Sequence, residues 1–306
     1  MDQDALSDVV RHLRPSGAIA SGFQAGGDWA LRFDDQQRRI KCYGVTRGSC
    51  LLTIDGMATP RRIQKGDCFI LPRGRTFVLA SDLSLTQTDA AKVFAQGADG
   101  SVQLNDGEGF SLVGCRFAVD APHREALLEG IPPVIHLTRT PDQDSLISDI
   151  KQMIHESRST RPGSRLMADH LAHMVLLHAF RAAVELHPEQ AGWLAALGDP
   201  RLGPVVASMH GDPAHRWTLA DLARLSGMSR SAFAAAFRAR TGATPMAYLD
   251  RWRMVLAAEK LVSGTRVAAI AVETGYASES SFSVAFKRVT GLSPRAFVKA
   301  HKEPGS

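Results

Sequence analysis

The 306-residue sequence predicts an α+β fold, with a β-barrel at the N-terminal end, a helical segment in the middle and an all-α C-terminal end. Three observations lead to this prediction. Apolar residues alternate with a period of two through roughly the first 120 residues, which indicates strands. From about residue 141 they recur at helical spacing. Between residues 218 and 294 one helical pattern occurs twice, which indicates a single structural unit used two times.

Charge is unevenly distributed along the chain. The net charge is +5, yet from Asp199 to the end there are 15 Lys/Arg against 8 Asp/Glu, which leaves 21 against 23 in the remainder. The hydrophobic content of 44% and the charged content of 22% are ordinary for a soluble globular protein. Only the end that carries the repeated pattern is basic, as expected of a region that meets nucleic-acid phosphates.

The sequence disfavours a secreted or membrane-spanning protein. The N-terminus, MDQDALSDVV, is acidic and has no apolar core, so a secretory signal is not expected. No uninterrupted apolar run approaches the roughly 20 residues of a membrane span. The four cysteines show no CxxC spacing, and scattered thiols are usually small buried residues in a reducing compartment. We therefore expect a cytoplasmic protein that does not enter a membrane.

Short, closely spaced strands are expected at the N-terminal end. Residues 29–33 alternate between apolar and other positions, as in a half-buried strand. Asp55-Gly56 is a strong signal for a two-residue hairpin. Many short strands at even spacing are typical of a closed or sandwiched β fold. Further strands are expected at residues 49–54, 68–71 and 110–119.

The segment GDCFILPRG, residues 66–74, resembles the second sequence motif of the cupin barrels. Metal-binding cupins place a histidine three residues after the second glycine, where this chain has Phe77. They also need a His-x-His pair near the first motif, where this chain has Lys41, Cys42 and Tyr43. Without imidazole ligands a first-row metal would be poorly held, so no metal and no cofactor are expected. A barrel without metal can still bind a small molecule in its mouth.

The pattern becomes helical from about Pro141 to Leu186. Leu146, Ile150 and Met153 recur at positions that form a buried stripe on the first helix. The second helix, over residues 165–186, is apolar on more than one side. We expect this second helix to serve as core or as a dimer surface.

Five histidines lie in or beside these helices: His155, His170, His173, His178 and His187. His170 and His173 are three positions apart and could share a helix face. No carboxylate completes a metal-binding set at this spacing. We expect these histidines to be polar residues at the margins of packed helices.

The first copy of the repeated pattern indicates a helix-turn-helix that starts at Thr218, a good N-cap. Asp221, three positions on, completes a capping box. Gly227 supplies a turn that needs a positive φ, and Ser229 caps the following helix. The usual partner of such a unit is duplex DNA.

The second copy starts at Val267, with Gly275 at the turn and Ser278 at the cap. Between the copies, residues 245–262 predict a long amphipathic helix. This helix would hold the two reading helices about one DNA turn, roughly 34 Å, apart. From Phe233 onward the copies match at a constant offset of 49, with Phe233 on Phe282, Phe237 on Phe286, Gly242 on Gly291 and Pro245 on Pro294.

The second helix of each copy, residues 229–240 and 278–288, is the predicted recognition helix. The phenylalanines face inward, so the opposite face is expected to meet DNA. In the first copy these candidate contacts are Arg230, Ser231, Ala234, Ala235, Arg238 and Arg240. In the second copy they are Glu279, Ser280, Ser283, Val284, Lys287 and Arg288.

Position along each helix suggests a role for each candidate. Arg230 and Ser231 lie near the N-terminal end, which reads base edges in such units. Glu279 could accept from a cytosine amino group, and Val284 could contact a thymine methyl group. The basic residues further along are better placed for phosphates, namely Arg238, Arg240, Lys287 and Arg288.

These residues make a family resemblance plain. The C-terminal hundred residues resemble the DNA-binding domain of the AraC/XylS family of transcriptional regulators. The stretch AxETGYxSESSFSxAFKRxxGxSP, ending at Pro294, follows the family signature almost throughout, and DRWRM (250–254) matches the linker helix. The N-terminal part resembles the cupin-type sensor domain common in that family.

The chain departs from the family pattern at the reading surface. Family members often carry arginine at or beside the positions of Ala235, Ala236 and Val284. Both predicted recognition helices are therefore short of long polar side chains in their middle. We expect DNA shape and phosphate contacts to carry more of the selectivity here.

The resemblance implies a division into three parts and a set of partners. Residues 1–135 are expected to form the sensor domain, 136–198 a helical linker and dimerisation segment, and 199–306 the DNA-binding domain. The implied partners are promoter DNA, RNA polymerase, a small-molecule effector and a second copy of the chain. Family habit favours an activator of transcription.

Two other functions are weighed beside this one. A cupin-type isomerase or dioxygenase would need a metal or an acid–base pair in the barrel, and the missing histidines oppose it. A binding module whose recognition helices contact a partner protein, such as RNA polymerase, could coexist with DNA binding. Two copies with basic tails on the only basic end argue against mere packing helices.

Overall fold

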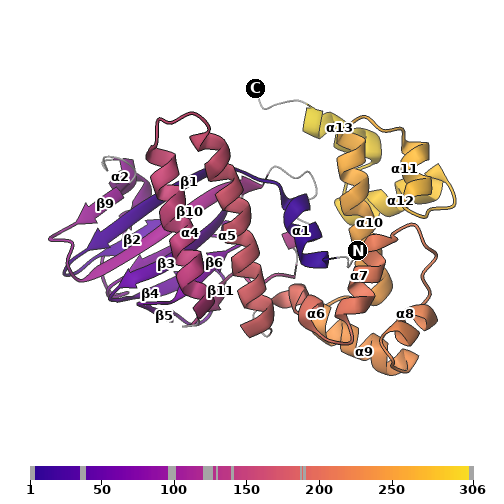
Figure 1. Ribbon diagram of the computed structural model, residues 1–306, viewed down its shortest axis with the longest axis horizontal. Helices are drawn as coiled ribbons and strands as arrows, with labels where there is room; N and C mark the ends of the chain where they lie inside the picture. Colours follow the sequence, from indigo (N-terminus) through magenta and orange to yellow (C-terminus); the bar gives the residue numbers. More distant parts are fainter. Residues whose placement is uncertain are drawn as a thin grey trace. The chain divides into compact units, whose positions relative to one another are not determined.

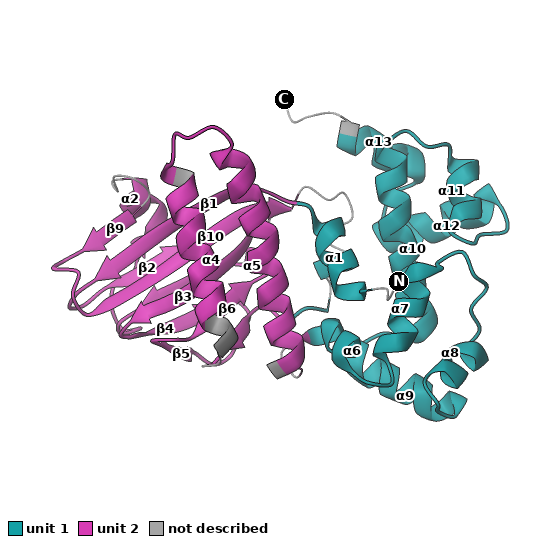
Figure 2. Cartoon of the chain, viewed as in Figure 1, with its two compact units in different colours: residues 1–14, 120–131, 192–306 teal, residues 15–119, 132–191 magenta. Residues whose placement is uncertain are grey.

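The structure is a computed structural model of the full chain (Figure 1). It describes residues 4–34, 39–95, 101–119, 127–128, 130–138, 141–186, 188 and 191–302. The chain divides into two compact units (Figure 2). Unit 1 contains residues 1–14, 120–131 and 192–306, and unit 2 contains residues 15–119 and 132–191.

Unit 2 is built on two β-sheets, as expected of a cupin-like barrel (Figure 1). The six-stranded sheet has the order β11-β6-β3-β10-β1-β9, and the five-stranded sheet has the order β5-β4-β7-β2-β8. The first sheet contains β1 (Pro15–Ala25), β3 (Arg39–Arg47), β6 (Cys68–Leu71), β9 (Ser101–Leu104), β10 (Phe110–Val119) and β11 (Ile135–Leu137). The second contains β2 (Ala30–Phe33), β4 (Ser49–Ile54), β5 (Arg61–Gln64), β7 (Phe77–Ala80) and β8 (Thr88–Asp89), and a short helix, α2 (Ala90–Ala95), follows it.

Alternating residues of both sheets form one apolar core. Cys50, Leu52 and Ile54 of β4 are buried while the residues between them are half-buried, which is the predicted period of two. The largest buried rings of this core come from both sheets and include Phe23, Phe69, Phe77 and Phe110. Because a slip by one residue would turn these rings to the other face, the core fixes the register of the strands that face it.

The predicted strands at 49–54, 68–71 and 110–119 are confirmed as β4, β6 and β10, and the strand at 29–33 is confirmed as β2. The two-residue hairpin at Asp55-Gly56 is wrong in its length. A tight turn does occur there, with Gly56 at a φ of 86° and Met57 N donating to Ile54 O at 2.9 Å. The partner strand β5 begins only at Arg61, because the residues up to Pro60 extend the connection.

Two helices cover one face of the six-stranded sheet, namely α4 (Pro141–Arg158) and α5 (Ser164–Leu186) (Figure 1). The predicted stripe of α4 is buried, with Ile150 and Met153 fully enclosed. A side chain at Gly44 of β3 would lie 2.5 Å from Ile147, so the helix packs directly on the strand. These helices thus belong to the same compact unit as the sheets, whereas the sequence predicts a separate segment over 136–198.

The histidines of these helices lie at the margins of the packing. His178 of α5 pairs with Asp149 of α4 at 2.5 Å, and His173 bonds to the carbonyl oxygen of Asp169 at 2.9 Å. His155 and His170 are exposed, and His187 lies outside the described residues. No group of three or more metal-ligating side chains occurs among the residues that the structure describes.

The four cysteines are buried and unpaired. Cys115 of β10 lies directly opposite Cys42 of β3 in the antiparallel register. Burial raises the pKa of Cys50 and that of Cys68 to about 12, with Asp67 and Asp144 adding to the effect on Cys68. The thiols of Cys50 and Cys68 are therefore protonated and behave as small apolar residues.

Unit 1 is helical, and the first described helix of the chain is part of it. Helix α1 (Ala5–Leu13) begins at the N-cap Asp4, buries Val9, Val10 and Leu13, and contacts α7. The remaining elements are η3 (Gly192–Leu194), α6 (Ala195–Gly198), α7 (Gly203–Gly211), α8 (Leu219–Leu225), α9 (Arg230–Thr241), α10 (Pro245–Val262), α11 (Val267–Glu273), α12 (Glu279–Thr290) and α13 (Pro294–Lys302). Across the described part of the chain, the helices are all too short or too polar to cross a membrane.

Candidate nucleic-acid interface

The first helix-turn-helix consists of α8, a glycine turn and α9. Thr218 Oγ1 accepts from Asp221 N at 3.2 Å while Asp221 Oδ2 accepts from Thr218 N at 3.1 Å, so the predicted capping box is present. Gly227 has a φ of 64°, in the left-handed region that the sequence predicts for it. Ser229 then caps α9 by accepting from Ala232 N at 3.3 Å. The helix starts of this motif are thus set by local hydrogen bonds.

The second helix-turn-helix consists of α11, a second glycine turn and α12. Helix α11 begins at Arg266 without a side-chain cap, unlike α8. Gly275 has a φ of 78°. Ser278 caps α12 by accepting from Ser281 N at 3.1 Å, and Ser281 Oγ accepts in return from Ser278 N at 3.2 Å. The second recognition helix therefore starts with a reciprocal cap built from two serines.

The two copies share a matched C-terminal end. Thr241 Oγ1 donates to Phe237 O and Thr290 Oγ1 donates to Phe286 O, each at 2.8 Å. A glycine follows each helix in the left-handed conformation, with a φ of 73° at Gly242 and 77° at Gly291. The predicted inward anchors are confirmed as fully buried: Phe233, Phe237, Phe282 and Phe286.

The offset between the copies changes at the turn. Met228 N donates to Ala223 O at 3.0 Å, and Tyr276 N donates to Ala271 O at 2.8 Å, which places equivalent residues 48 positions apart. The caps Ser229 and Ser278 are 49 positions apart, the offset found in the sequence. The second turn therefore contains one extra residue between its glycine and its recognition helix.

The predicted contact residues lie on the surface of unit 1. Two of the twelve, Ala234 and Ser283, are half-buried, and the other ten are exposed. The exposed fraction of Val284 reaches 69%, although its side chain is apolar. The ten exposed residues are Arg230, Ser231, Ala235, Arg238, Arg240, Glu279, Ser280, Val284, Lys287 and Arg288.

The basic residues of the recognition helices differ in their partners. Arg288 pairs with Asp250 of α10 at 2.8 Å, and Arg240 lies 3.7 Å from Asp199. Arg230, Arg238 and Lys287 form no ion pair with any residue that the structure describes. Arg238 and Lys287 also occupy equivalent positions at the offset of 49, so each copy presents one unpaired cation at the same place.

The connecting helix α10 is enclosed on most of its surface. His210 of α7 stacks on Trp252 with ring centroids 3.7 Å apart and lies 2.9 Å from the hydroxyl of Tyr248. Burial lowers the pKa of His210 to about 3, with His12 of α1 adding to the effect. The stack is therefore uncharged and joins α7 to α10 as part of the core.

The sequence pattern does not predict the residues that tie α10 to the segment before α8 and to the second helix-turn-helix. Arg253 donates from Nε to Pro213 O at 2.7 Å and from a terminal nitrogen to His215 O at 2.9 Å. Tyr276 donates to Asp250, the same carboxylate that holds Arg288. Asp250 and Arg253 belong to the DRWRM segment, but their partners are too distant along the chain to be inferred from spacing.

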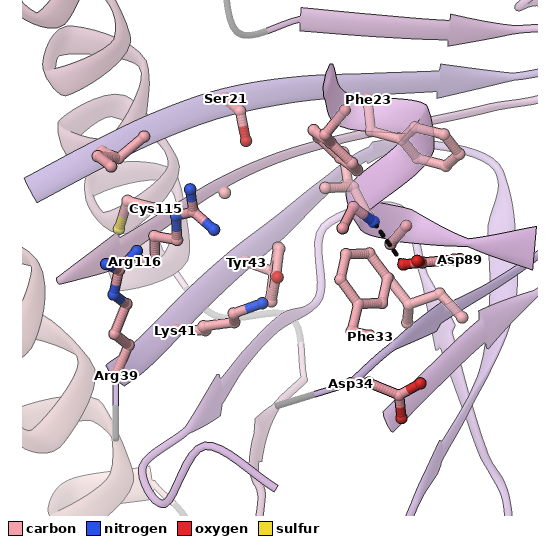
Figure 3. A pocket seen from close by; sticks show the side chains of 17 residues that line it. Ser21, Phe23, Phe33, Asp34, Arg39, Lys41, Tyr43, Asp89, Cys115 and Arg116 are labelled. Carbon is pink, nitrogen blue, oxygen red and sulfur yellow. Dashed lines mark hydrogen bonds between the residues drawn. The ribbon is translucent and has the colours of Figure 1, made fainter. Parts of the chain in front are cut away.

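Unit 2 contains a cavity of about 410 Å³ that residues of both sheets and α2 line (Figure 3). Lys41, which stands where metal-binding cupins have a ligand, lines it and is only 4% exposed. Burial, together with the charges of Arg116 and Arg39, lowers the pKa of Lys41 to about 7. Its ammonium group lies 4.9 Å and 5.0 Å from the ring centroids of Phe33 and Phe77.

Comparison with known proteins gives matches to both the sheet-rich part and the helix-turn-helix part of the chain. The family described as cupin matches residues 4–185, and the helix-turn-helix domain family matches residues 222–300. A protein of Streptomyces antibioticus described as a putative AraC-like transcription regulator is 40% identical over 97% of this chain and 98% of its own. A similarly described protein of Streptomyces lividans is 39% identical over 97% and 98%.

The chain belongs to the AraC-like transcription regulators. The expectation that this regulator is no enzyme is confirmed by its relatives, which are named as regulators of transcription. ToxT of Vibrio cholerae O395 aligns over 94% of this AraC-like chain and 99% of its own, at 11% identity and a TM-score of 0.38.

Proposed function

We propose that this AraC-like regulator binds duplex DNA sequence-specifically through two recognition helices, α9 and α12. The observation that carries the proposal is their equivalence. Both begin at a serine cap, both bury two phenylalanines, and both present an unpaired cation, Arg238 or Lys287, at matched positions. A repeated motif that places a cation at the same point of each helix suits a partner that repeats itself, as the major groove does.

The length of α10 supports simultaneous reading of two grooves. Its 18 residues span about 27 Å at roughly 1.5 Å per residue. Its side chains contact both helix-turn-helix motifs, through Tyr248 on Phe237 and through Arg253 on Tyr276. A stiff helix of this length suits two reading helices placed about one DNA turn, or roughly 34 Å, apart.

The position of each exposed residue supports a proposed role. Arg230, Ser231 and Glu279 are the proposed readers of base edges, because they lie in the first turn of their helices. Arg238 and Lys287 are the proposed phosphate contacts.

Other residues of the two helices contribute less directly. Arg240 and Arg288 already have carboxylate partners, so DNA would have to compete for them. The exposed side chains of Ala235 and Val284 are small and apolar, which favours apolar contacts and DNA shape over arginine readout.

The remaining parts of the proposal concern regulation. Residues 199–306 serve as the DNA-binding domain and the barrel of unit 2 as the sensor of a small-molecule effector. The segment 136–198 offers a dimer surface, since Leu166, Met167 and Met174 of α5 are exposed apolar residues. With RNA polymerase as a further partner, the regulator acts as an activator.

Titration of DNA binding against salt tests the proposal. Replacing Arg238 or Lys287 by alanine is expected to weaken binding to every DNA sequence about equally, and to reduce the slope of log K against log salt by about 1. Arg230→Ala and Glu279→Ala are expected to change sequence preference instead. The matched control is Arg62→Ala, which removes a cation from β5 of unit 2.

Fluorescence anisotropy measures both quantities, with promoter DNA from beside the regulator's own gene and with scrambled DNA of the same length. Binding of the full chain to both, with a preference for one sequence, is the expected result. If the full chain binds neither DNA at low salt, or if Arg62→Ala weakens binding as much as Arg238→Ala, the proposed interface is wrong.

A further inference from the structure

Three neighbouring strands supply alternate residues to one wall of the cavity in unit 2. In the antiparallel register, Lys41 of β3 lies opposite Arg116 of β10, and Arg116 lies opposite Ile19 of β1. The next cavity-facing level is formed by Tyr43, Gly114 and Ser21. Because strand side chains alternate, these residues share one face of the sheet.

A close approach of Tyr43 to Gly114 shapes this wall. A side chain added at Gly114 would lie 2.4 Å from Cδ1 of Tyr43. The tyrosine ring therefore packs against the glycine, where no side chain pushes it towards the cavity. The space in front of the ring stays open to a ligand.

The same wall gathers three cations at one end of the cavity: Arg39, Lys41 and Arg116 (Figure 3). None of the three forms an ion pair with a carboxylate in the part of the chain that the structure describes. Lys41 is buried, Arg39 is half-buried and Arg116 is exposed, so positive charge extends from the interior towards solvent. The three positive charges repel one another, and burial weakens the screening of this repulsion by solvent.

The other end of the cavity is aromatic. The ring centroid of Phe94 lies 6.2 Å from that of Phe23 and 6.1 Å from that of Phe33. Phe33 also faces the ammonium group of Lys41, so the aromatic and cationic ends meet at this ring. A ligand that spans the cavity would thus meet a charged end and an apolar end in succession.

Two carboxylates line the aromatic end, and both already have partners. Asp34 pairs with Arg32 at 2.8 Å. Asp89 accepts from Ala91 N at 2.8 Å (Figure 3). They therefore do not neutralise the three cations. Their negative charge opposes a second anionic group at that end of the cavity.

We propose that the effector of this regulator is a small organic anion, with one anionic head group beside Arg39, Lys41 and Arg116 and an apolar body against Phe23, Phe33 and Phe94. The proposal rests on the effector cavity of the proposed function and adds the chemical class of the ligand. An anion gives the three cations the counter-charge that the described residues do not supply. Guanidinium groups suit carboxylate or phosphate oxygens equally well.

Lys41 makes the binding depend on pH. With its pKa near 7 in the empty cavity, Lys41 loses its proton as the pH rises through neutrality. The groups around it are Arg39 on its own strand, Arg116 on β10, the phenol of Tyr43, and the carboxylates Asp34 and Asp89 across the cavity. A bound anion favours the charged form of Lys41. The affinity for the anion is therefore expected to fall as the pH rises from about 6 to about 8.5.

Isothermal titration calorimetry of the full chain with ω-phenylalkanoates of increasing length, starting at 4-phenylbutyrate, tests the proposal. The matched amides have the same apolar body but no charge. The matched ω-phenylalkyl phosphates have a phosphate head group in place of the carboxylate. At least one of the two anionic series is expected to bind at least about tenfold more tightly than the amides. Which series binds identifies the head group.

Variants distinguish the effect of the three cavity cations on binding from an effect of positive charge elsewhere in unit 2. Lys41→Met and Arg116→Met are each expected to weaken binding of the anion at pH 6 by about tenfold or more, because each removes one of the counter-charges. Lys41→Met is also expected to abolish the dependence of carboxylate binding on pH. Lys65→Met removes the same charge from an exposed turn of unit 2 and is expected to change nothing.

The outcomes distinguish this proposal from the proposed function. Amides that bind as tightly as the anions would overturn the anionic ligand and leave an effector cavity in place. If no probe of any series binds at millimolar concentration, the anionic ligand and the effector cavity both fail. DNA binding, measured separately by anisotropy, decides the remainder of the proposed function.

Discussion

The side chain of Lys41 lies in surroundings that disfavour its positive charge. Its side chain is buried beside two phenylalanine rings and close to two arginines, an environment that favours the neutral amine. In the sequence, Lys41 indicates only that a metal ligand of the metal-binding cupins is missing at this position. Apart from Arg39, the neighbours that give it a different role come from distant strands and depend on register. Register is not visible in a single pattern of residues.

We predict that Lys41→Met stabilises the ligand-free protein at low pH. The folded-state pKa of about 7 lies below the unfolded value of about 10.5, so the penalty is fully present below pH 7 and fades as the pH rises towards 10.5. The gain in unfolding free energy is expected to be on the order of a few kcal/mol at pH 6 and to shrink by about pH 9. Urea unfolding at both values measures it, and a gain that is independent of pH would contradict the account.

At the scale of elements, the sequence predicts those segments whose signals are local. Strands β4, β6 and β10 and the helix caps Thr218, Ser229 and Ser278 follow from short patterns. Strand β1, PSGAIASGFQA, gives no such signal, because its small residues and glycines hide the period of two. The sequence likewise does not show which residues surround a turn in the folded chain. Gly227 and Gly275 look alike in the sequence, yet their neighbours differ.

We predict that alanine is tolerated much better at Gly227 than at Gly275. Both residues have a positive φ, which costs an alanine about 1–2 kcal/mol. A side chain at Gly227 would have no heavy atom within 4 Å, whereas at Gly275 it would lie 2.5 Å from Ala214 O and 3.0 Å from the Arg253 guanidinium. Gly275→Ala is therefore expected to lose several kcal/mol by forcing the backbone to shift. Thermal unfolding of the two variants compares them, and equal losses would refute this difference.

At the scale of the whole molecule, the chain does not divide into consecutive segments. Helix α1 packs with the helices of unit 1, where His12 lies 3.0 Å from Glu259 of α10 and edge-on to Trp252. Helices α4 and α5 instead belong with the sheets. Composition and the repeat correctly predict a β half and a basic helical half. Which half each amphipathic helix joins depends on where a complementary apolar face lies, and that is a property of the folded chain.

The proposal that α9 and α12 enter successive major grooves is the central claim about the whole molecule. Its physical basis is the repetition of one motif, with a cation at the same position of each helix, on two helices that α10 joins. A rigid pair of this kind binds both grooves together only if the spacing of the helices matches the helical repeat of DNA. Because a rigid pair binds as one body, loss of a phosphate contact on either helix, at Arg238 or at Lys287, should weaken the protection of both grooves together.

Hydroxyl-radical and methylation protection on a selected binding site test this claim most directly. We predict two protected major-groove patches centred about 10 base pairs apart. Arg238→Ala and Lys287→Ala should each weaken both patches in parallel. A single protected patch, or a variant in which only one of the two patches fades, would contradict the claim.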